Sequence, residues 1–256
     1  MRITTTISVL ILTISVFFSL FANNPDNNDS YTEKKETLFY NVLYNYGVVS
    51  INAGEFELTT NTIDFEGEQC YYFQSESRTN QKWKWLYDIN STRNVISSVS
   101  DLQPIKYNQS VEHGSHKTTY SYNFEDDSIL IKSFVDGKKH KTELKNNNSV
   151  YDALTAVHYV RTLDFNSFNI GDSLEINVLH DTEFLNQKIF FKGIVNLIKE
   201  DGQSYECYKF SSIIKNNDII SAIEPAEVWV STDKRRLPLK IIVKITVGSV
   251  EINLMD

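Results

Sequence analysis

Apolar and polar residues alternate along most of the chain after Thr37, and Gly, Asn and Asp interrupt the alternation at short intervals. A period of two is typical of strands with one buried face, and such interruptions are typical of hairpin turns. The clearest run places Leu239, Ile241 and Val243 on one face and Lys240 and Lys244 on the other. The pattern predicts strands at 38–46, 54–60, 70–77, 83–89, 118–124, 128–135, 173–179, 187–197, 205–212, 227–231 and 239–247.

One segment, SVYDALTAVHYVRTLDF (149–165), departs from this alternation. Leu154, Val157 and Val160 recur at helical spacing, and Ser149 with Asp152 three residues later suits an N-terminal cap. We therefore expect one substantial helix near residues 150–163. A lone amphipathic helix must bury its apolar stripe, so we expect it to pack across the concave face of the sheet.

These elements predict a mainly β fold: a large curved antiparallel sheet, or an open barrel or pair of half-barrels, forming one domain over 37–256. The helix would join two halves, 37–148 and 166–256. EGEQCYYF (66–73) and DGQSYECYKF (201–210) resemble each other, and each is followed by a Trp-bearing strand. Internal duplication and chance recurrence of hairpin patterns both remain open as explanations.

The N-terminus has the layout of a signal peptide. Arg2 precedes the uncharged run 7–22, and a polar stretch follows. The run is shorter than the roughly 20 residues of a spanning helix, although an uncleaved anchor is the alternative. We expect cleavage after Ala22, a disordered lead-in over 23–36, and an exported protein, periplasmic or secreted, with no membrane span after cleavage.

Composition adds little to this picture. The 15 Phe and 14 Tyr suit pleated surfaces. The formal net charge is −8, and the cations are scattered along the sequence, which does not indicate a nucleic-acid or anionic-membrane surface.

The densest group of chemical side chains is VWVSTDKRRLPLKI (228–241). Its pattern is strand, polar turn, strand, with Asp233 able to bond its own backbone and Pro238 at the entry to the second strand. We interpret it as a structural turn, with Trp229 in the strand before it. The stretch after Trp85, which carries Asp88 and Arg93, has a similar pattern and the same interpretation.

Other groups that could carry chemistry have simpler interpretations. His113 and His116 resemble metal ligands, but no further ligands accompany them, so we expect an exposed hairpin tip and no metal. Nine Gly are too thinly spread for a phosphate-binding loop, and no cofactor is expected. Cys70 and Cys207 could form a disulfide in an exported chain, but buried free thiols are the favoured interpretation.

Asp152, His158 and Arg161 fall together on the expected helix, yet no nucleophile motif accompanies them. We therefore predict no catalytic residue and expect Asp152 and Arg161 to pair or cap where the helix meets the sheet. The order of YNVLYNYGVVSINAGEFEL (40–58), DLQP (101–104), the Asp152–Arg161 block, the Trp229–Pro238 block and VGSVEINL (247–254) resembles the DUF3108 family of exported bacterial proteins. This resemblance implies the fold but no activity.

The chain is also similar, more weakly, to envelope proteins of the lipoprotein-carrier type, whose curved sheet holds acyl chains against helices. The leading hypothesis is a non-enzymatic cell-envelope protein that binds an apolar, lipid-like ligand in the concave face of its sheet. A protein-interaction or envelope-assembly factor is the second hypothesis, and a hydrolase with an unrecognised site is the third. The candidate ligand-binding or structural residues are Asp152, His158, Arg161, Trp83, Trp85 and Trp229.

Overall fold

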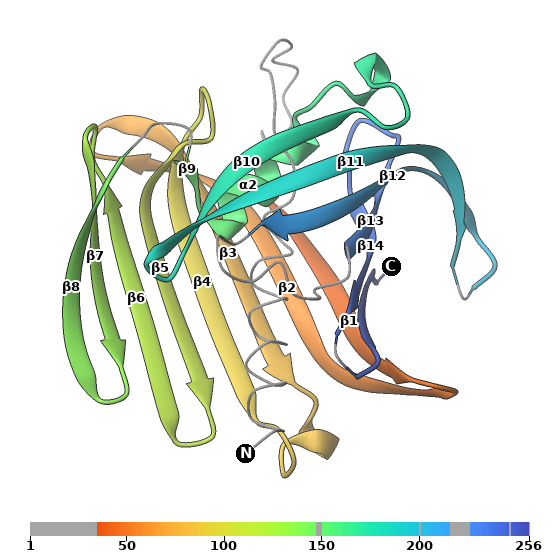
Figure 1. The fold of residues 1–256 in the computed structure, drawn as a ribbon, viewed down its shortest axis with the longest axis horizontal. Coiled ribbons are helices and arrows are strands. Elements are labelled where there is room, and N and C mark those ends of the chain that lie inside the picture. Colours follow the sequence, from red (N-terminus) through yellow and green to blue (C-terminus); the bar gives the residue numbers. More distant parts are fainter. Residues whose placement is uncertain (1–34, 147–149, 200, 216–225, 246, 256) are drawn as a thin grey trace.

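A single curled sheet forms nearly all of the structure (Figure 1). The computed structural model describes residues 35–146, 150–199, 201–215, 226–245 and 247–255, apart from the side chains of Val160, Ile214 and Lys215. Within these residues the sheet has 15 strands in the order β8-β7-β6-β5-β4-β3-β2-β1-β15-β14-β13-β12-β11-β10-β9.

The strands of the N-terminal half are β1 (Glu36–Tyr46), β2 (Val49–Phe65), β3 (Glu68–Thr79), β4 (Ile89–Ser98), β5 (Pro104–His113), β6 (His116–Phe124), β7 (Ser128–Val135) and β8 (Lys138–Lys145). The later strands are β9 (Val150–Tyr151), β10 (Ser173–His180), β11 (Glu183–Ile198), β12 (Ser204–Lys215), β13 (Ala226–Ser231), β14 (Pro238–Lys244) and β15 (Ser249–Leu254). The helical elements are α2 (Ala153–Arg161) and the 3-10 turns η1 (Gln81–Trp83) and η2 (Phe165–Ser167).

The sheet is mostly antiparallel and remains open. Neighbouring strands run antiparallel except β9 and β10, which are parallel. The first and last strands, β1 and β15, pair in the middle of the sheet, with Tyr40 opposite Leu254. The edge strands are β8 and β9, so the sheet curls without closing into a barrel. The predicted large curved antiparallel sheet is confirmed.

Local sequence accounts for the turns and for part of the curvature. Glu66-Gly67 and Asp136-Gly137 both have positive φ at both positions, as the two-residue turn of a twisted hairpin requires. Register shifts interrupt the β1–β2 ladder after Val42 and the β11–β12 ladder at Gly193. An extra residue on one strand bends it and increases its twist, which favours curling.

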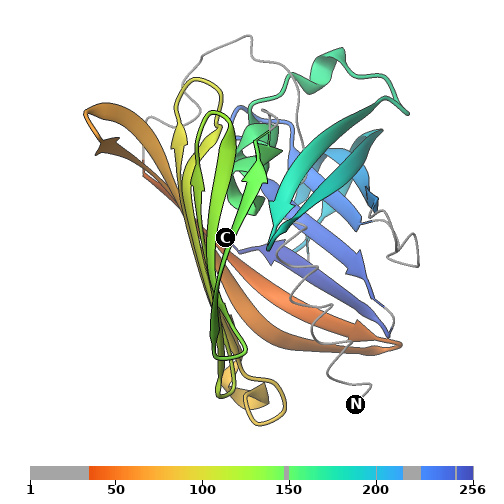
Figure 2. The same cartoon turned by 60° about the vertical axis from the view of Figure 1, so that its left-hand side comes forward.

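Helix α2 lies inside the curl, where it packs against β3, β4, β9 and β10 (Figure 2). Leu154 and Val157 are buried, which confirms the expected packing on the concave face. Ser149, expected to cap the helix, lies outside the described residues. The described start of the helix is instead capped by Asp152, as detailed below.

The alternation predicts a strand at 83–89, and this prediction is wrong. Residues 81–83 form the 3-10 turn η1, residues 84–88 continue the loop, and strand β4 begins only at Ile89. Trp85 and Leu86 are exposed, so no buried sheet face holds this segment extended. The aromatic residues of this segment are common in strands, which explains the wrong prediction.

Strands β4, β5, β8, β9 and β15 are not among the predicted ones. Strand β8, KKHKTELK, contains almost no apolar residue and follows β7 only through the Asp136-Gly137 turn. The predicted strand 239–247 is too long at its end, because β14 ends at Lys244 and a separate strand, β15, begins at Ser249.

The stretch 228–241 forms strand β13, a tight turn and strand β14, as predicted. The Asp233 carboxylate accepts hydrogen bonds from the Arg235 backbone N–H at 3.2 Å and from the Ser231 hydroxyl at 2.6 Å. The predicted structural turn is therefore confirmed.

Within the described residues no helix combines the length and hydropathy needed to cross a membrane. The predicted signal peptide and residues 23–34 of the predicted lead-in lie outside the described part. Strand β1 already includes Glu36, the last residue of that lead-in.

Candidate functional site

The N-terminus of helix α2 is built around Asp152, which is fully buried. Its Oδ1 accepts hydrogen bonds from the backbone N–H groups of Leu154 at 2.7 Å and Thr155 at 3.4 Å, and its Oδ2 accepts from the Thr155 hydroxyl at 2.7 Å. These bonds satisfy helix donors that lack intrahelical partners. Desolvation by burial raises the pKa of Asp152 to about 6, although these hydrogen bonds oppose the shift.

This raised pKa predicts a pH dependence of stability. A carboxyl whose pKa is higher in the folded state than its ordinary value of 3.8 ionises first in the unfolded state, so its contribution to folding is lost as pH rises from 4 to 6. Asp152→Asn keeps a capping side chain but cannot ionise. We expect the free energy of unfolding of D152N, relative to the unmodified protein, to rise by roughly 2–3 kcal/mol between pH 4 and pH 7. Urea titrations across this range measure the difference, and a difference independent of pH would contradict the assignment.

His158 lies against the sheet as an aromatic packing group. Its ring stacks on Phe73 of β3 with centroids 3.6 Å apart and planes 10° from parallel. Burial, and then the nearby Arg161, hold the pKa of His158 well below its ordinary value, which favours the neutral ring. It is fully buried, which does not suit a proton-transfer group that must reach a substrate.

Arg161 ties the end of the helix to two distant parts of the sheet. Its guanidinium Nη2 lies 2.7 Å from the Glu36 carboxylate of β1 and donates to the Arg235 carbonyl at 3.0 Å. The side chain of Arg161 is 2% exposed. Asp152 caps the helix and Arg161 pairs with Glu36, in agreement with the pairing and capping interpretation, whereas His158 packs against Phe73.

The structure does not bring the Trp candidates to this helix. Trp83 and Trp85 lie in the β3–β4 loop, half-buried and exposed respectively. Trp229 is buried on β13, with the Lys209 ammonium 4.7 Å from its ring centroid. His113 and His116 end β5 and begin β6, the expected hairpin tip. Both cysteines are free and buried, as favoured.

A cluster of buried polar groups on the concave face is missed by sequence reasoning. Arg93 of β4 is 4% exposed, and its Nε donates to the side-chain Oε1 of Gln109 on β5 at 3.3 Å. The Tyr107 hydroxyl donates to the same oxygen at 2.7 Å. Burial raises the pKa of Tyr107, and Arg93 opposes the rise. Among the described residues, no carboxylate lies within ion-pair distance of Arg93.

The tip of the β10–β11 hairpin completes this polar cluster, which consists of Arg93, Gln109, Tyr107, His180 and Asp181. Burial lowers the pKa of His180, and Asp181 opposes this shift. The Nε2 atom of His180 lies 3.7 Å from the Asp181 carboxylate, too far for a hydrogen bond, and has no other hydrogen-bond partner. Burial and Asp181 also raise the pKa of neighbouring Tyr120 to about 12. A buried cation without a counter-ion and an unbonded imidazole are both costly, and such groups mark places for a missing polar partner.

The signal for this cluster is present in the sequence but ambiguous. Arg93 alternates with Ser91 and Val95, which places it on the buried face once β4 is recognised as a strand. Placing the strand too early, at 83–89, assigns Arg93 to a turn instead. His180 and Asp181 are close to Arg93 only through the folding of the sheet.

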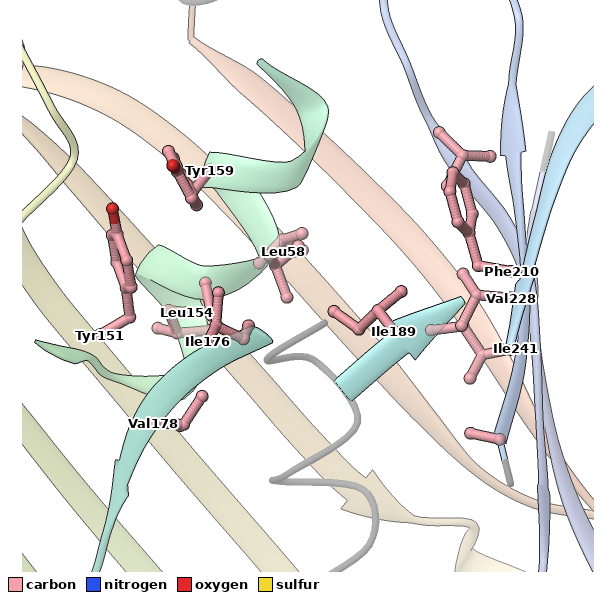
Figure 3. Close-up of a cluster of buried hydrophobic side chains, with 14 of the residues drawn as sticks. Leu58, Tyr151, Leu154, Tyr159, Ile176, Val178, Ile189, Phe210, Val228 and Ile241 are labelled. Atoms are coloured by element: carbon pink, nitrogen blue, oxygen red, sulfur yellow. The ribbon is translucent and has the colours of Figure 1, made fainter. Parts of the chain in front are cut away.

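Two groups of apolar side chains, called the apolar walls below, lie on the concave face and are buried together in one hydrophobic cluster. Figure 3 shows Leu154 of the helix and Ile176 and Val178 of β10 on one side, with Phe210 and Val228 of the C-terminal strands on the other. The concave side of the sheet therefore combines long aliphatic and aromatic surfaces with one polar cluster.

The opposite, outer face of β4–β6 has a hollow of about 300 Å³. It is lined by Thr92, Asn94, Asn108, Gln109, Ser110, Thr119, Tyr120 and Ser121. The described residues contain no group of three or more His, Cys, Asp or Glu side chains that could hold a metal ion.

The described residues form an open, curled and mostly antiparallel sheet around helix α2. The model of the DUF3108 family, a family of unknown function, matches residues 40–255, and the chain belongs to this family. Its fold is similar to the crystal structure of a β-barrel-like protein with a domain of unknown function, DUF1849, from Brucella abortus. That match has a TM-score of 0.56 and 6% identity, and covers 86% of this chain and 95% of the other. No curated protein matches the chain.

Proposed function

We propose that the protein is a non-enzymatic, exported cell-envelope protein that binds an amphipathic, lipid-like ligand on the concave face of its sheet. The acyl part would lie along the apolar walls, and an acidic head would lie at the polar cluster. The observation that carries this proposal is Arg93, a buried cation on the ligand-facing side whose hydrogen-bond partners are neutral.

The open sheet supports this function. Lipid-like ligands need an apolar, concave surface and a path to it. The edges β8 and β9 do not pair with each other, so the sheet is not closed along these two strands. The helix meets β3, β4, β9 and β10, and the walls of the C-terminal strands face it across the curl.

The chemistry of the polar cluster supports an acidic head. An acidic group would supply the counter-charge that Arg93 lacks, and His180 Nε2 could accept a hydrogen bond from a hydroxyl or donate one when protonated. Asp181 would disfavour an anion, but its side chain is 40% exposed, so water screens it.

A matched pair of arginine substitutions tests this assignment. We expect Arg93→Met to weaken binding of a dansyl-labelled fatty acid about ten-fold to a hundred-fold, because a charge-assisted hydrogen bond to the head is lost. Binding of the corresponding methyl ester should change little. Fluorescence titration measures both affinities. Arg78→Met is the control, because Arg78 is exposed and pairs with Glu55 on the outer surface.

Stability measurements separate this role from a structural one. Replacing a buried, unpaired cation by an apolar side chain of similar volume should leave the protein as stable or make it more stable. Loss of stability in R93M with unchanged fatty-acid affinity would contradict the proposal. Native mass spectrometry of protein purified from its own envelope is the direct test: a retained lipid supports ligand binding, whereas an associated protein would favour the assembly-factor hypothesis.

A further inference from the structure

The β3–β4 loop, residues 80–88, presents two large apolar side chains to solvent. Trp85 is 79% exposed and Leu86 is 62% exposed. The base of the loop is fixed, because the Asn80 N–H donates to the Ala53 carbonyl at 2.9 Å and the Ile89 N–H donates to the Thr79 hydroxyl at 3.0 Å. The 3-10 turn η1 then carries the chain outward, at the lower edge in Figure 1. The exposed pair is therefore held on a fixed support.

Other turns at the same end of the sheet carry exposed apolar side chains or lysines. In an antiparallel sheet the turns after β1, β3, β5 and β7 lie at one end of the strands. The turn after β1 exposes a second apolar tip, with Val48 fully exposed and Val49 55% exposed. Cations outnumber carboxylates around the turns after β3, β5 and β7, with Lys82, Lys84, Lys117, Lys138 and Lys139 against Asp88, Glu112 and Asp136. Two of these lysines are ion-paired, Lys84 with Asp88 and Lys117 with Glu112, so the excess charge comes from the other three.

The opposite end of the same strands is strongly acidic. The turns after β2, β4 and β6 and the residues beside them carry Asp64, Glu66, Glu68, Asp101, Glu125, Asp126 and Asp127. Cations also lie at the β13–β14 turn, but Arg235 pairs with Glu36 there and the Arg236 guanidinium lies over the rings of Phe165 and Tyr208. The N-terminal half of the sheet is thus charged asymmetrically along its strands.

We propose that the β3–β4 loop docks the protein on a bilayer that contains anionic lipids, with Trp85 and Leu86 inserted at the level of the head groups. Trp is favoured at this level because its ring is amphipathic, and lysines beside it are attracted to anionic head groups. The acidic end would then point away from the surface. A protruding loop suits insertion better than a protein interface, which is typically a broad patch of about 800 Å² per partner.

Vesicle co-sedimentation tests the proposal. We expect the protein to bind vesicles of phosphatidylethanolamine and phosphatidylglycerol, and Trp85→Ala to weaken partitioning about ten-fold or more, because a large apolar side chain is no longer buried. Lys82→Glu with Lys84→Glu should weaken binding to these vesicles by at least about ten-fold, and binding to pure phosphatidylcholine much less. Bromine-labelled lipids should quench tryptophan emission in the unmodified protein more than in the Trp85→Ala variant.

Ile198→Ser is the matched control, because Ile198 is also an exposed apolar residue, at 71%, but lies beside the β11–β12 turn and not in the β3–β4 loop. It should bind vesicles like the unmodified protein. Equal losses in Ile198→Ser and Trp85→Ala would overturn the proposal, because binding would then follow general surface hydrophobicity. Absence of binding to vesicles of either composition would also overturn it and would assign Trp85 and Leu86 to a protein partner. None of these outcomes depends on whether the concave face holds a ligand.

Discussion

Replacing Arg161 by Ala is expected to lower the free energy of unfolding by about 3–5 kcal/mol, the usual loss when one partner of a buried ion pair is removed. The Arg161 side chain is 2% exposed and joins the end of helix α2 to Glu36 of β1 and to the Arg235 carbonyl. Its removal leaves the Arg235 carbonyl without this donor, and it leaves the Glu36 carboxylate with the exposed guanidinium of Arg235, 3.3 Å away, as its remaining partner. Urea denaturation followed by circular dichroism measures the loss.

Arg235 is the natural control, because it pairs with the same carboxylate of Glu36 at 3.3 Å while its own side chain is 60% exposed. Arg235→Ala should cost less than about 1 kcal/mol, since water screens exposed pairs. The interaction of Arg161 with the Arg235 carbonyl persists in this variant because it uses the backbone. Similar losses in the two variants would show that burial does not set the strength of the Arg161 pair.

Trp229→Ala is expected to cost about 3–5 kcal/mol, the range found when large aromatic side chains are removed from packed positions. Trp229 is 9% exposed in the middle of β13, and the Lys209 ammonium lies over its ring. Thermal and urea unfolding should both show the loss.

Trp85→Ala is the matched comparison, because the same substitution removes a side chain that is 79% exposed. It should change the free energy of unfolding by no more than about 0.5 kcal/mol. The same limit is expected for Lys234→Ala in the β13–β14 turn. A loss in Trp85→Ala as large as that in Trp229→Ala would mean that the β3–β4 loop contributes to the core.

The sequence pattern predicts an element correctly where the interactions that form it lie within a few residues. Strand β7 has the bounds that the sequence predicts, because SILIKSFV alternates and acidic or glycine turns enclose it. The helix is predictable because Leu154 and Val157 recur at helical spacing, and its cap differs from the expected one because Asp152 lies closer to the first turn. The turn at 231–237 follows from Asp233, whose side chain bonds the nearby backbone.

Prediction from sequence fails where neighbouring strands supply the stabilisation. Strand β8 has little apolar signal and is held by the hydrogen bonds of β7, and the aromatic segment 83–89 resembles a strand but forms a turn and loop instead. With strand β4 misplaced, Arg93 falls in a turn, so the polar cluster cannot be recognised from the sequence.

The sequence by itself determined the class of fold, the position of the helix and most of the hairpin turns, because alternation, helical spacing and turn residues act over a few positions. Tertiary structure alone decided which groups share a site. Arg93 and His180 meet because the sheet curls, and Arg161 reaches Glu36 because the first strand pairs in the middle of the sheet. Lysines that are scattered along the sequence gather at one end because antiparallel pairing returns every second turn to the same side.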